Sequence, residues 1–295
     1  MNRRLACRAV VTTMFVAALG LASPATAAAA PVAPGFASVA DATIAPGALM
    51  ITPFDQSTVT ACTANFVFSG GGGTYLGYAA HCAGASGAMG LSGCENPTLP
   101  LGTTVMVEGK DGVRISTTLA YSSWTTMQER GETDEALCLF NDFALVKLDP
   151  GDVDKVDPSV PELGGPTGLD TNGTQNGEPV FSYQPNDGRA AVKEGSSLGD
   201  TDGGLTHQVR TAPPGRPGDS GGGYLDGEGN AFGVLSTRFV DGTNGVTDLA
   251  RALSYANRYG DVSSVTLVRG TEPFASPSGQ APSEFPELEF PELIP

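Results

Sequence analysis

The sequence predicts an all-β protein built as two halves. Short apolar stretches recur along the chain and are separated by Gly, Asn, Asp and Ser, a spacing typical of strands in a sandwich or barrel. The 40 Gly and 22 Pro suit a turn-rich chain and stay below the content that marks low complexity. Between Pro150 and Thr167 several Pro, Gly and Asp cluster without periodicity, so this segment is expected to link the halves.

The first 30 residues are expected to be a secretory signal peptide. Three arginines come before an apolar run over residues 9–21, and Ala25-Thr26-Ala27 then supplies the small-residue cleavage pattern. The run is too short to cross a bilayer comfortably, since about 20 residues are needed. We therefore expect a secreted, extracellular protein that is cut between Ala27 and Pro31.

After the signal, residues 31–45 are Ala- and Pro-rich and are expected to form a short pro-segment or arm. Strands are predicted at Ala48–Ile51, Thr63–Phe68, Thr104–Val107, Phe143–Leu148, Ala231–Leu235, Gly245–Thr247 and Val262–Val268.

These strands define an N-terminal half over 46–150 and a C-terminal half over 168–270, joined by the linker 151–167. A short helix is predicted at Ala250–Tyr259. Residues 271–295 are acidic and Pro-rich with a repeated Glu-Phe-Pro-Glu-Leu unit, and we expect a disordered tail there, with docking of the Phe-Pro units as the alternative.

The charge balance excludes two classes of partner. Removal of residues 1–30 takes away three Arg and no acid, which leaves 13 basic and 32 acidic residues and a formal charge near −19. Such a surface repels nucleic acid phosphates and anionic membranes.

The cysteines predict disulfides. Cys7 lies in the signal, and an even number remains in an exported chain, so two disulfides are expected, with three pairings open. A zinc site is disfavoured because no close ligand spacing occurs and only two His are present. We expect no metal and no cofactor.

The segment Gly218-Asp219-Ser220-Gly221-Gly222 contains a candidate nucleophile. A serine hydroxyl needs a base and donors that accept the developing oxyanion, and flanking glycines allow a sharp turn and close approach of substrate. The N–H groups of Gly218 and Ser220 can then point at one oxygen. The alternative is an ordinary Gly-rich turn.

Chain order decides between the known serine arrangements. The α/β-hydrolase elbow requires a His after the nucleophile, and none follows Ser220. The subtilisin order requires Asp before His, and no such pair stands in a recognisable setting. The order His81, Asp142, Ser220 remains, which is the order of chymotrypsin-like enzymes.

Three blocks make the resemblance explicit: Ala79-Ala80-His81-Cys82, Asn141–Leu148 and Gly218–Gly222. The chain resembles the chymotrypsin/trypsin family of secreted serine peptidases, bacterial type, over about Cys62 to Tyr259.

The resemblance implies two packed antiparallel β-barrels with the site between them. It implies a serine endopeptidase in which Ser220 attacks, His81 is base and acid, Asp142 orients the imidazole, and Gly218 and Ser220 form the oxyanion hole. Protein or peptide substrates and a monomer are expected.

The resemblance also implies a disulfide between Cys62 and Cys82, which leaves Cys94 with Cys138.

The sequence departs from the family at two points. It lacks the Ile-Val-Gly-Gly start whose freed amine pairs with the Asp beside the nucleophile, so the partner of Asp219 stays open. The family position of the pocket floor holds Pro214, which does not support cleavage after Arg or Lys.

The segment Ser236-Thr237-Arg238 resembles the strand that binds substrate and walls the pocket. Arg238 and Arg216 would favour an acidic side chain, or would equally point to solvent.

Several alternatives stay open. Asp134 and Asp149 are the nearest substitutes for Asp142, and His207 is interpreted as a surface or pocket-rim residue. Asp-rich turns near Asp170 and Asp200 are interpreted as plain turns rather than calcium sites. A catalytically silent binding protein on the same scaffold and a serine esterase of another fold are the competing functions.

Overall fold

The structure is a computed structural model that describes residues 35–55, 57–85, 92–188 and 190–277. The expected signal peptide, the first residues of the expected arm and residues 278–295 of the expected tail lie outside the described residues. Thr271, at the start of the expected disordered tail, is instead buried and hydrogen-bonded to Ser159.

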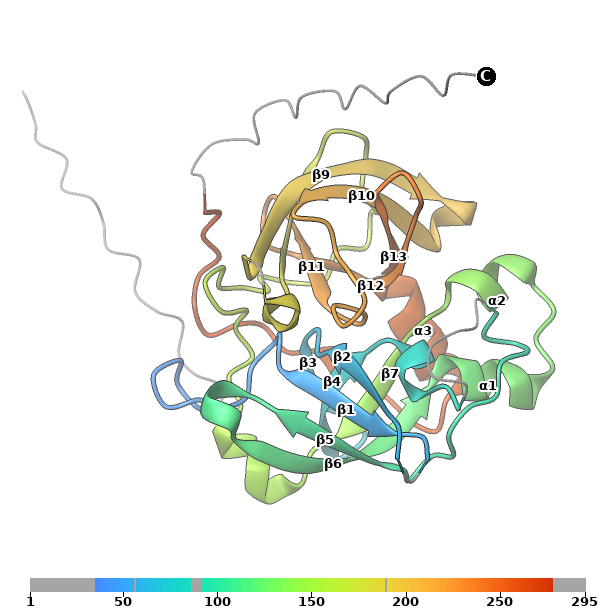
Figure 1. Cartoon of the computed structure of the whole chain (residues 1–295), viewed down its shortest axis with the longest axis horizontal. Helices are drawn as coiled ribbons and strands as arrows, with labels where there is room; N and C mark the ends of the chain where they lie inside the picture. The colour runs from blue at the N-terminus through green and yellow to red at the C-terminus, as the bar shows by residue number, and fades with distance from the viewer. Residues whose placement is uncertain (1–34, 56, 86–91, 189, 278–295) are drawn as a thin grey trace, which may run out of the picture.

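The N-terminal half is one antiparallel sheet (Figure 1). Its strands run in the order β14-β3-β4-β7-β6-β5-β1-β2. The strands of this sheet are β1 (Leu49–Pro53), β2 (Val59–Thr63), β3 (Val67–Gly70), β4 (Gly73–Tyr78), β5 (Thr104–Glu108), β6 (Arg114–Ser122), β7 (Ala144–Lys147) and β14 (Thr266–Leu267).

The C-terminal half is a closed six-stranded barrel in the order β10-β13-β12-β11-β8-β9. In Figure 1 it lies above the first sheet. The strands of this barrel are β8 (Pro179–Tyr183), β9 (Val192–Thr201), β10 (Thr206–Ala212), β11 (Gly223–Asp226), β12 (Ala231–Arg238) and β13 (Asn244–Asp248).

The all-β prediction is confirmed, with one difference in detail. The second half closes on itself through hydrogen bonds, whereas the first is an eight-stranded sheet that ends at β2 and β14. The edge strand β14 comes from the far end of the chain and pairs with β3, Thr266 opposite Ser69. The C-terminal segment therefore completes the N-terminal sheet, which the linear order of the sequence does not indicate.

Alternation of side chains explains why β6 forms a strand with one buried face. Ile115, Thr117, Leu119 and Tyr121 are buried while the residues between them are more exposed. Successive side chains in a strand point to opposite faces, so a period of two places this set in the core.

The described residues contain three α-helices: α1 (Ser123–Arg130), α2 (Glu135–Phe140) and α3 (Leu249–Tyr259). The C-terminal helix was predicted and is confirmed; Asp248 caps it by accepting a hydrogen bond from the Arg251 N–H. The sequence analysis missed α1 and α2. Short 3₁₀ turns lie at η1 (Ala80–Ala83), η2 (Lys110–Gly112), η3 (Pro150–Lys155), η4 (Pro185–Asp187) and η5 (Asp202–Gly204).

Two predicted strands differ from the structure. Thr63–Phe68 is split between β2 and β3 because the Asn65 side chain accepts a hydrogen bond from the Phe66 N–H and bends the chain there. Val262–Val268 reduces to β14, since the Asn257 side chain bonds both the N–H and the C=O of Val265 and ties that residue to α3.

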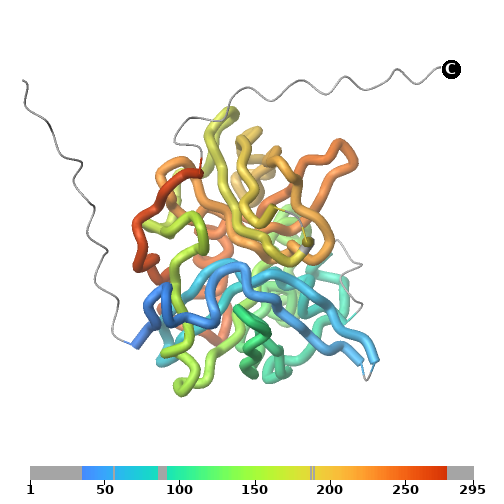
Figure 2. The backbone as a smooth tube through the Cα atoms, turned by 60° about the vertical axis from the view of Figure 1, so that its left-hand side comes forward, coloured from blue at the N-terminus to red at the C-terminus, as the bar shows by residue number. Residues whose placement is uncertain are grey.

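Segments far apart in the sequence lie side by side on the face opposite α1 (Figures 1 and 2). The arm near Val39, the linker near Val160 and the end near Pro273 line one groove. Within the described residues, no helix is long and apolar enough to span a membrane.

Candidate active site

The three predicted catalytic residues line one cleft of about 630 Å³ between the two halves. His81 and Asp142 come from the N-terminal half and Ser220 from the loop between β10 and β11 of the barrel. The structure thus brings together residues separated by 61 and 78 positions in the sequence.

His81 lies on η1, where its backbone and its ring both contact Asp142. The His81 N–H donates to Asp142 Oδ1 at 2.8 Å, and ring Nδ1 lies 2.6 Å from Asp142 Oδ2. Burial disfavours the charged imidazolium, but the adjacent carboxylate and its hydrogen bond outweigh burial and raise the pKa of His81. This arrangement fixes Nδ1 toward the acid and leaves Nε2 for the cleft.

Asp142 is 3% exposed and is held by neighbours on both sides in the chain. The Ser123 hydroxyl donates to the Asn141 carbonyl at 2.6 Å and accepts from the Phe143 N–H at 3.1 Å. The Ser236 hydroxyl donates to Asp142 Oδ2 at 2.6 Å. Burial acts to raise the pKa of the Asp142 carboxyl, but the charge and hydrogen bonds of His81 and the hydrogen bond from Ser236 outweigh it, so that the pKa is lowered and the carboxylate stays charged.

The loop that carries Ser220 is attached to the N-terminal half by three hydrogen bonds. The Thr63 N–H donates to the Ser220 carbonyl at 2.8 Å, and the Thr63 hydroxyl donates to the Gly218 carbonyl at 2.8 Å. The Asn65 amide donates to the Gly221 carbonyl at 3.1 Å. The carbonyls are thereby turned toward the first sheet, which directs the intervening N–H groups the other way.

Two of those N–H groups are available at the cleft. Within the described part of the chain, neither the Gly218 N–H nor the Ser220 N–H makes a hydrogen bond, and both residues line the cleft. Gly218 has φ of +100°, a backbone conformation that an L side chain rarely adopts. The Ser220 hydroxyl likewise has no hydrogen bond to His81 Nε2 among these residues.

The partner that sequence reasoning left open for Asp219 is Lys193. Its Nζ lies 3.0 Å from Asp219 Oδ2, and both side chains are fully buried. Asp219 Oδ2 also accepts from the Arg216 N–H at 2.9 Å. No pattern along the chain indicates that Lys193 is buried, because the inward positions of β9 that follow it are Gly195 and Ser197 and show no apolar alternation.

The wall predicted at Ser236, Thr237 and Arg238 does line the cleft, whereas Pro214 does not. The base is formed instead by Asn244, which the sequence analysis missed. Its Oδ1 accepts from the Gly215 N–H at 2.8 Å, and its Nδ2 donates to the Thr237 carbonyl at 3.2 Å. Because this buried amide ties the neighbour of Pro214 to the opposite wall, Pro214 itself stays outside.

Apolar side chains form another part of the cleft wall. They come from α1, α2 and the end of β12, and several are exposed although large. The apolar residues of this wall are Trp124, Leu139, Phe140, Phe239 and Val240.

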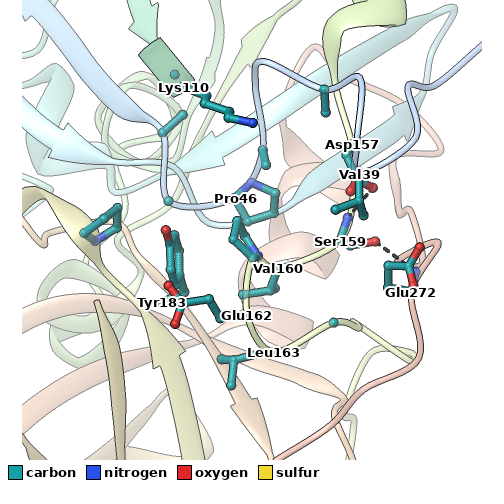
Figure 3. Close-up of a pocket in the computed structure, with 18 of the residues that line it drawn as sticks. Val39, Pro46, Lys110, Asp157, Ser159, Val160, Glu162, Leu163, Tyr183 and Glu272 are labelled. Atoms are coloured by element: carbon teal, nitrogen blue, oxygen red, sulfur yellow. Dashed lines mark hydrogen bonds between the residues drawn. The ribbon is translucent and has the colours of Figure 1, made fainter. Parts of the chain in front are cut away.

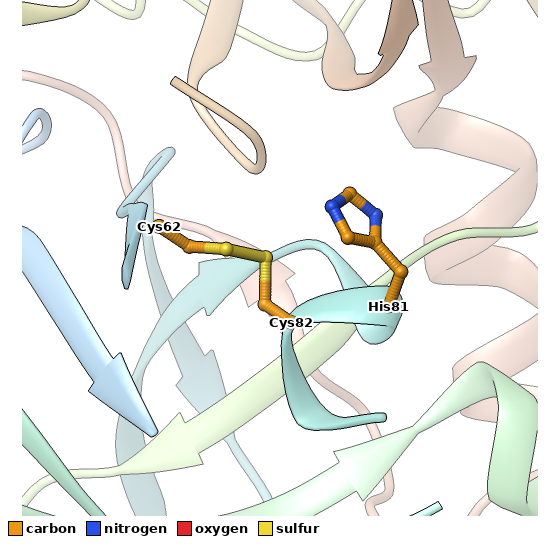
Figure 4. Close-up of side chains that lie close together, drawn as sticks. All are labelled: Cys62, His81 and Cys82. Atoms are coloured by element: carbon orange, nitrogen blue, oxygen red, sulfur yellow. A yellow bond between two sulfur atoms is a disulfide. The ribbon is translucent and has the colours of Figure 1, made fainter. Parts of the chain in front are cut away.

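Both disulfides implied by the resemblance are confirmed, Cys62–Cys82 and Cys94–Cys138. The first lies directly beside His81 (Figure 4). His81, Cys62 and Cys82 are grouped closely enough for a metal ion. The two sulfurs are bonded to each other, so they do not offer thiolates, and the group does not fit a zinc site.

The alternative carboxylates serve as helix caps. Asp134 Oδ1 accepts from the Leu137 N–H at the start of α2, and Asp149 Oδ1 accepts from the Gly151 N–H at the start of η3. Asp170 similarly accepts from the Asn172 N–H in a plain turn.

The prediction for His207 was wrong. It is fully buried in the barrel, where Nε2 lies 3.0 Å from Asp248 Oδ2 and Nδ1 lies 2.9 Å from the Thr174 hydroxyl. The Asp248 carboxylate and the Thr174 hydroxyl take the place of water as hydrogen-bond partners of both ring nitrogens. The ring of His207 can therefore be buried in the barrel.

A second groove of about 670 Å³ lies at the arm, linker and C-terminal segment (Figure 3). It contains none of the triad candidates. Its one buried serine, Ser159, is hydrogen-bonded to the Thr271 hydroxyl at 2.9 Å and has no histidine beside it. Of these two grooves, the cleft between the halves is therefore the one that holds the three candidate residues.

The structure is similar to solved serine proteases. Thermobifida fusca protease A is 20% identical, with a TM-score of 0.48, over 78% of this chain and 100% of that chain. The HtrA-type protease AlgW is 19% identical, with a TM-score of 0.47, over 76% of this chain and 62% of that chain. Nocardiopsis protease is 18% identical, with a TM-score of 0.43, over 76% and 98%.

No protein-family model matches the sequence. No curated protein is similar to it either. The sequence analysis expected two β halves around a shared cleft, and the structure has this arrangement, with an eight-stranded sheet and a closed six-stranded barrel.

Proposed function

We propose that this protein is a secreted serine endopeptidase that hydrolyses peptide bonds through an acyl-enzyme on Ser220. The observation that carries the proposal is the position of His81. Its Nδ1 is 2.6 Å from a buried carboxylate, and its ring lines the same cleft as the candidate nucleophile. That constellation is what makes a serine hydroxyl reactive.

In the proposed reaction Ser220 Oγ attacks the carbonyl carbon of the scissile bond and its proton passes to His81 Nε2. The tetrahedral intermediate then collapses, the C–N bond breaks, and His81 returns the proton to the leaving amine. Water repeats the sequence on the acyl-enzyme and releases the acid. Asp142 stays charged throughout and stabilises the imidazolium.

The free N–H groups of Gly218 and Ser220 support an oxyanion hole. Fixed donors directed at the position where negative charge develops stabilise the transition state, and the loss of one typically costs about 3 kcal/mol. The hydrogen bonds from Thr63 to this loop hold its carbonyls away from the cleft.

The two disulfides support the proposed extracellular location, because disulfides persist in oxidising compartments. The apolar wall at Trp124 and Leu139 supports a peptide substrate, since it offers contact area on either side of the bond to be cut.

A fluorophosphonate probe tests the proposal. We expect one equivalent of label on Ser220, identified by peptide mass spectrometry, and hydrolysis of a mixed peptide library. Ser220→Ala should remove both, by roughly 10⁴-fold or more in rate. Ser263→Ala, an exposed serine outside the cleft, is the matched control. Folded protein that is neither labelled nor active would refute the function.

One observation favours the alternative, a catalytically silent binding protein. The Ser220 hydroxyl makes no hydrogen bond to His81 within the described residues. Hydrogen bonds of this kind are often long in unliganded enzymes and tighten with substrate. The same labelling experiment separates the two functions, because a silent protein binds peptides without reacting at Ser220.

A further inference from the structure

The cleft has the opposite charge to the rest of the protein. The chain carries 32 acidic and 16 basic residues, yet the fully positive side chains that line the cleft are Arg216 and Arg238. Among the described lining residues the one carboxylate is Asp142, which is buried against His81. Neither guanidinium makes an ion pair or hydrogen bond within the described part of the chain. Two unpaired guanidinium groups are therefore available to a ligand that binds in the cleft.

The two arginines stand on opposite walls of one gap. Arg216 is on the loop that leads to Ser220, and Arg238 ends β12, which also carries Ser236. The Asn244 side chain bonds the residues that precede them, accepting from the Gly215 N–H and donating to the Thr237 carbonyl. A single side chain thus joins the two walls, and each arginine directly follows in the sequence the residue that Asn244 holds.

Asn244 forms the base of this gap. Asn244 is 1% exposed, and its amide is occupied by the two walls. A Cβ on Gly215 would lie 2.7 Å from Leu235 Cδ2, and one on Gly245 would lie 2.7 Å from Thr237 Cγ2. Apart from Asp142, the described lining residues include no carboxylate, so nothing at the base would pair with a long basic side chain.

We propose that the cleft selects peptides with an acidic side chain at the residue whose carbonyl Ser220 attacks, held between Arg216 and Arg238. This inference rests on the proposed peptidase function. A short side chain that ends in a carboxylate reaches the rim, where the guanidinium groups donate paired hydrogen bonds. A lysine or arginine side chain at that position meets two like charges.

Both arginines are exposed, so solvent weakens each contact and the expected preference is moderate. We expect kcat/KM for a Glu peptide to exceed that for the matched Gln peptide by roughly tenfold at low salt. The ratio should fall as salt rises, because the Debye length shrinks from about 10 Å at 0.1 M to about 3 Å at 1 M.

The test uses the mature protein and four fluorogenic peptides that differ only at this residue, as Glu, Gln, Leu or Lys. In Arg216→Gln with Arg238→Gln the Glu-to-Gln ratio should approach one. In the charge reversal Arg216→Glu with Arg238→Glu the Lys peptide should become the better substrate. Arg114→Gln, an exposed arginine paired with Glu108 away from the cleft, should keep the original ratio. Each ratio compares two peptides cleaved by the same variant, so a loss of activity that affects both peptides equally does not change it.

Failure of this inference is distinguishable from failure of the function. Labelling of Ser220 together with equal cleavage of the Glu and Gln peptides would overturn the acidic preference and leave the peptidase standing. A folded protein that is not labelled and cleaves none of the four peptides would overturn both.

Discussion

At the scale of single residues, the site depends on a proton balance between His81 and Asp142. The general base must be neutral to take the Ser220 proton, whereas the neighbouring carboxylate favours the charged imidazolium. Burial of the ring lowers the pKa of His81, but the charge and hydrogen bond of Asp142 raise it by more. The pKa of His81 therefore lies above its usual value. The base is therefore strong, and it is also lost to protonation at a higher pH than for a free histidine.

The first prediction concerns this pH dependence. In the wild type, kcat/KM should fall as pH decreases through a midpoint above 6.5, the usual pKa of histidine, because protonated His81 cannot act as base. In Asp142→Asn the opposing burial dominates, so the midpoint should move to lower pH and the maximal rate should drop by roughly 10⁴-fold. Rate profiles from pH 5 to 9 measure both.

Asp149→Asn is the control for that experiment, because Asp149 is an exposed cap outside the cleft. Its profile should match the wild type. A midpoint in Asp142→Asn that equals the wild-type value would contradict the proposed role of the carboxylate.

The second prediction at this scale concerns the buried ion pair of Lys193 and Asp219. In Lys193→Met the carboxylate next to the nucleophile loses its cation while remaining fully buried. Breaking one side of such a pair typically costs about 3–5 kcal/mol in the free energy of unfolding. Activity should also fall, because Asp219 holds the Arg216 N–H and so shapes the loop.

Urea unfolding and peptide hydrolysis measure these two effects. Lys193→Met combined with Asp219→Asn should recover part of the lost stability, since no charge is then buried alone. If Lys193→Met and the wild type had the same free energy of unfolding, the ion pair between Lys193 and Asp219 would not contribute to stability.

At the scale of elements, the loop Gly218–Gly222 must lie flat on the N-terminal sheet. Gly221 has φ of +89°, and a Cβ there would come within 2.6 Å of the Thr63 carbonyl oxygen and 2.8 Å of the Ala79 N. Both are backbone atoms, which cannot move unless the end of β2 and the start of η1 move with them. The absence of a side chain therefore sets how closely Ser220 approaches the half that carries His81.

The third prediction follows from this contact. Gly221→Ala should lower kcat/KM by roughly 100-fold or more, because the loop must shift away and misplacement by about 1 Å can cost that much. Gly242→Ala is the matched control, since its φ of +85° carries the same strain and nothing lies within 4 Å of its Cβ. Both variants should lose about 1–2 kcal/mol of stability from the left-handed backbone.

Peptide hydrolysis and thermal unfolding distinguish the two substitutions. Full activity in Gly221→Ala would mean that the loop tolerates displacement. A loss of activity as large in Gly242→Ala would mean that strain, rather than contact, is responsible.

At the scale of the whole molecule, the chain crosses twice between its halves. The barrel strand β13 leads into α3, which contacts α1 of the first half, and β14 then pairs with β3. The Thr63, Asn65 and Ser236 hydrogen bonds cross the same boundary. The catalytic geometry is therefore a property of the docking of the halves, because each contributes groups that the other positions.

Much of the site follows from local sequence. His81, Asp142 and Ser220 each stand in a block whose neighbours are typical of their roles, and their order along the chain excludes other arrangements. The strands with clear alternation or apolar runs, such as Thr104–Val107 and Ala231–Leu235, were likewise predictable, because a period of two is a local property. The cysteine count required two disulfides but left their pairing open.

The sequence could not predict the roles of residues whose neighbours in the chain form no recognisable pattern. Lys193, Asn244 and Ser123 are ordinary polar residues along the chain, and they matter because folding buries them against distant partners. The interior position of His207 has the same origin.

The sequence by itself predicted the proposed chemistry, since it contains the reactive residue types in the order that this chemistry requires. The tertiary structure alone decided the geometry and charge of the cleft, including the base at Asn244 and the two arginines of its walls. The physical reason is that reactivity is a property of residue types, whereas burial, pairing and close approach depend on which segments meet in space.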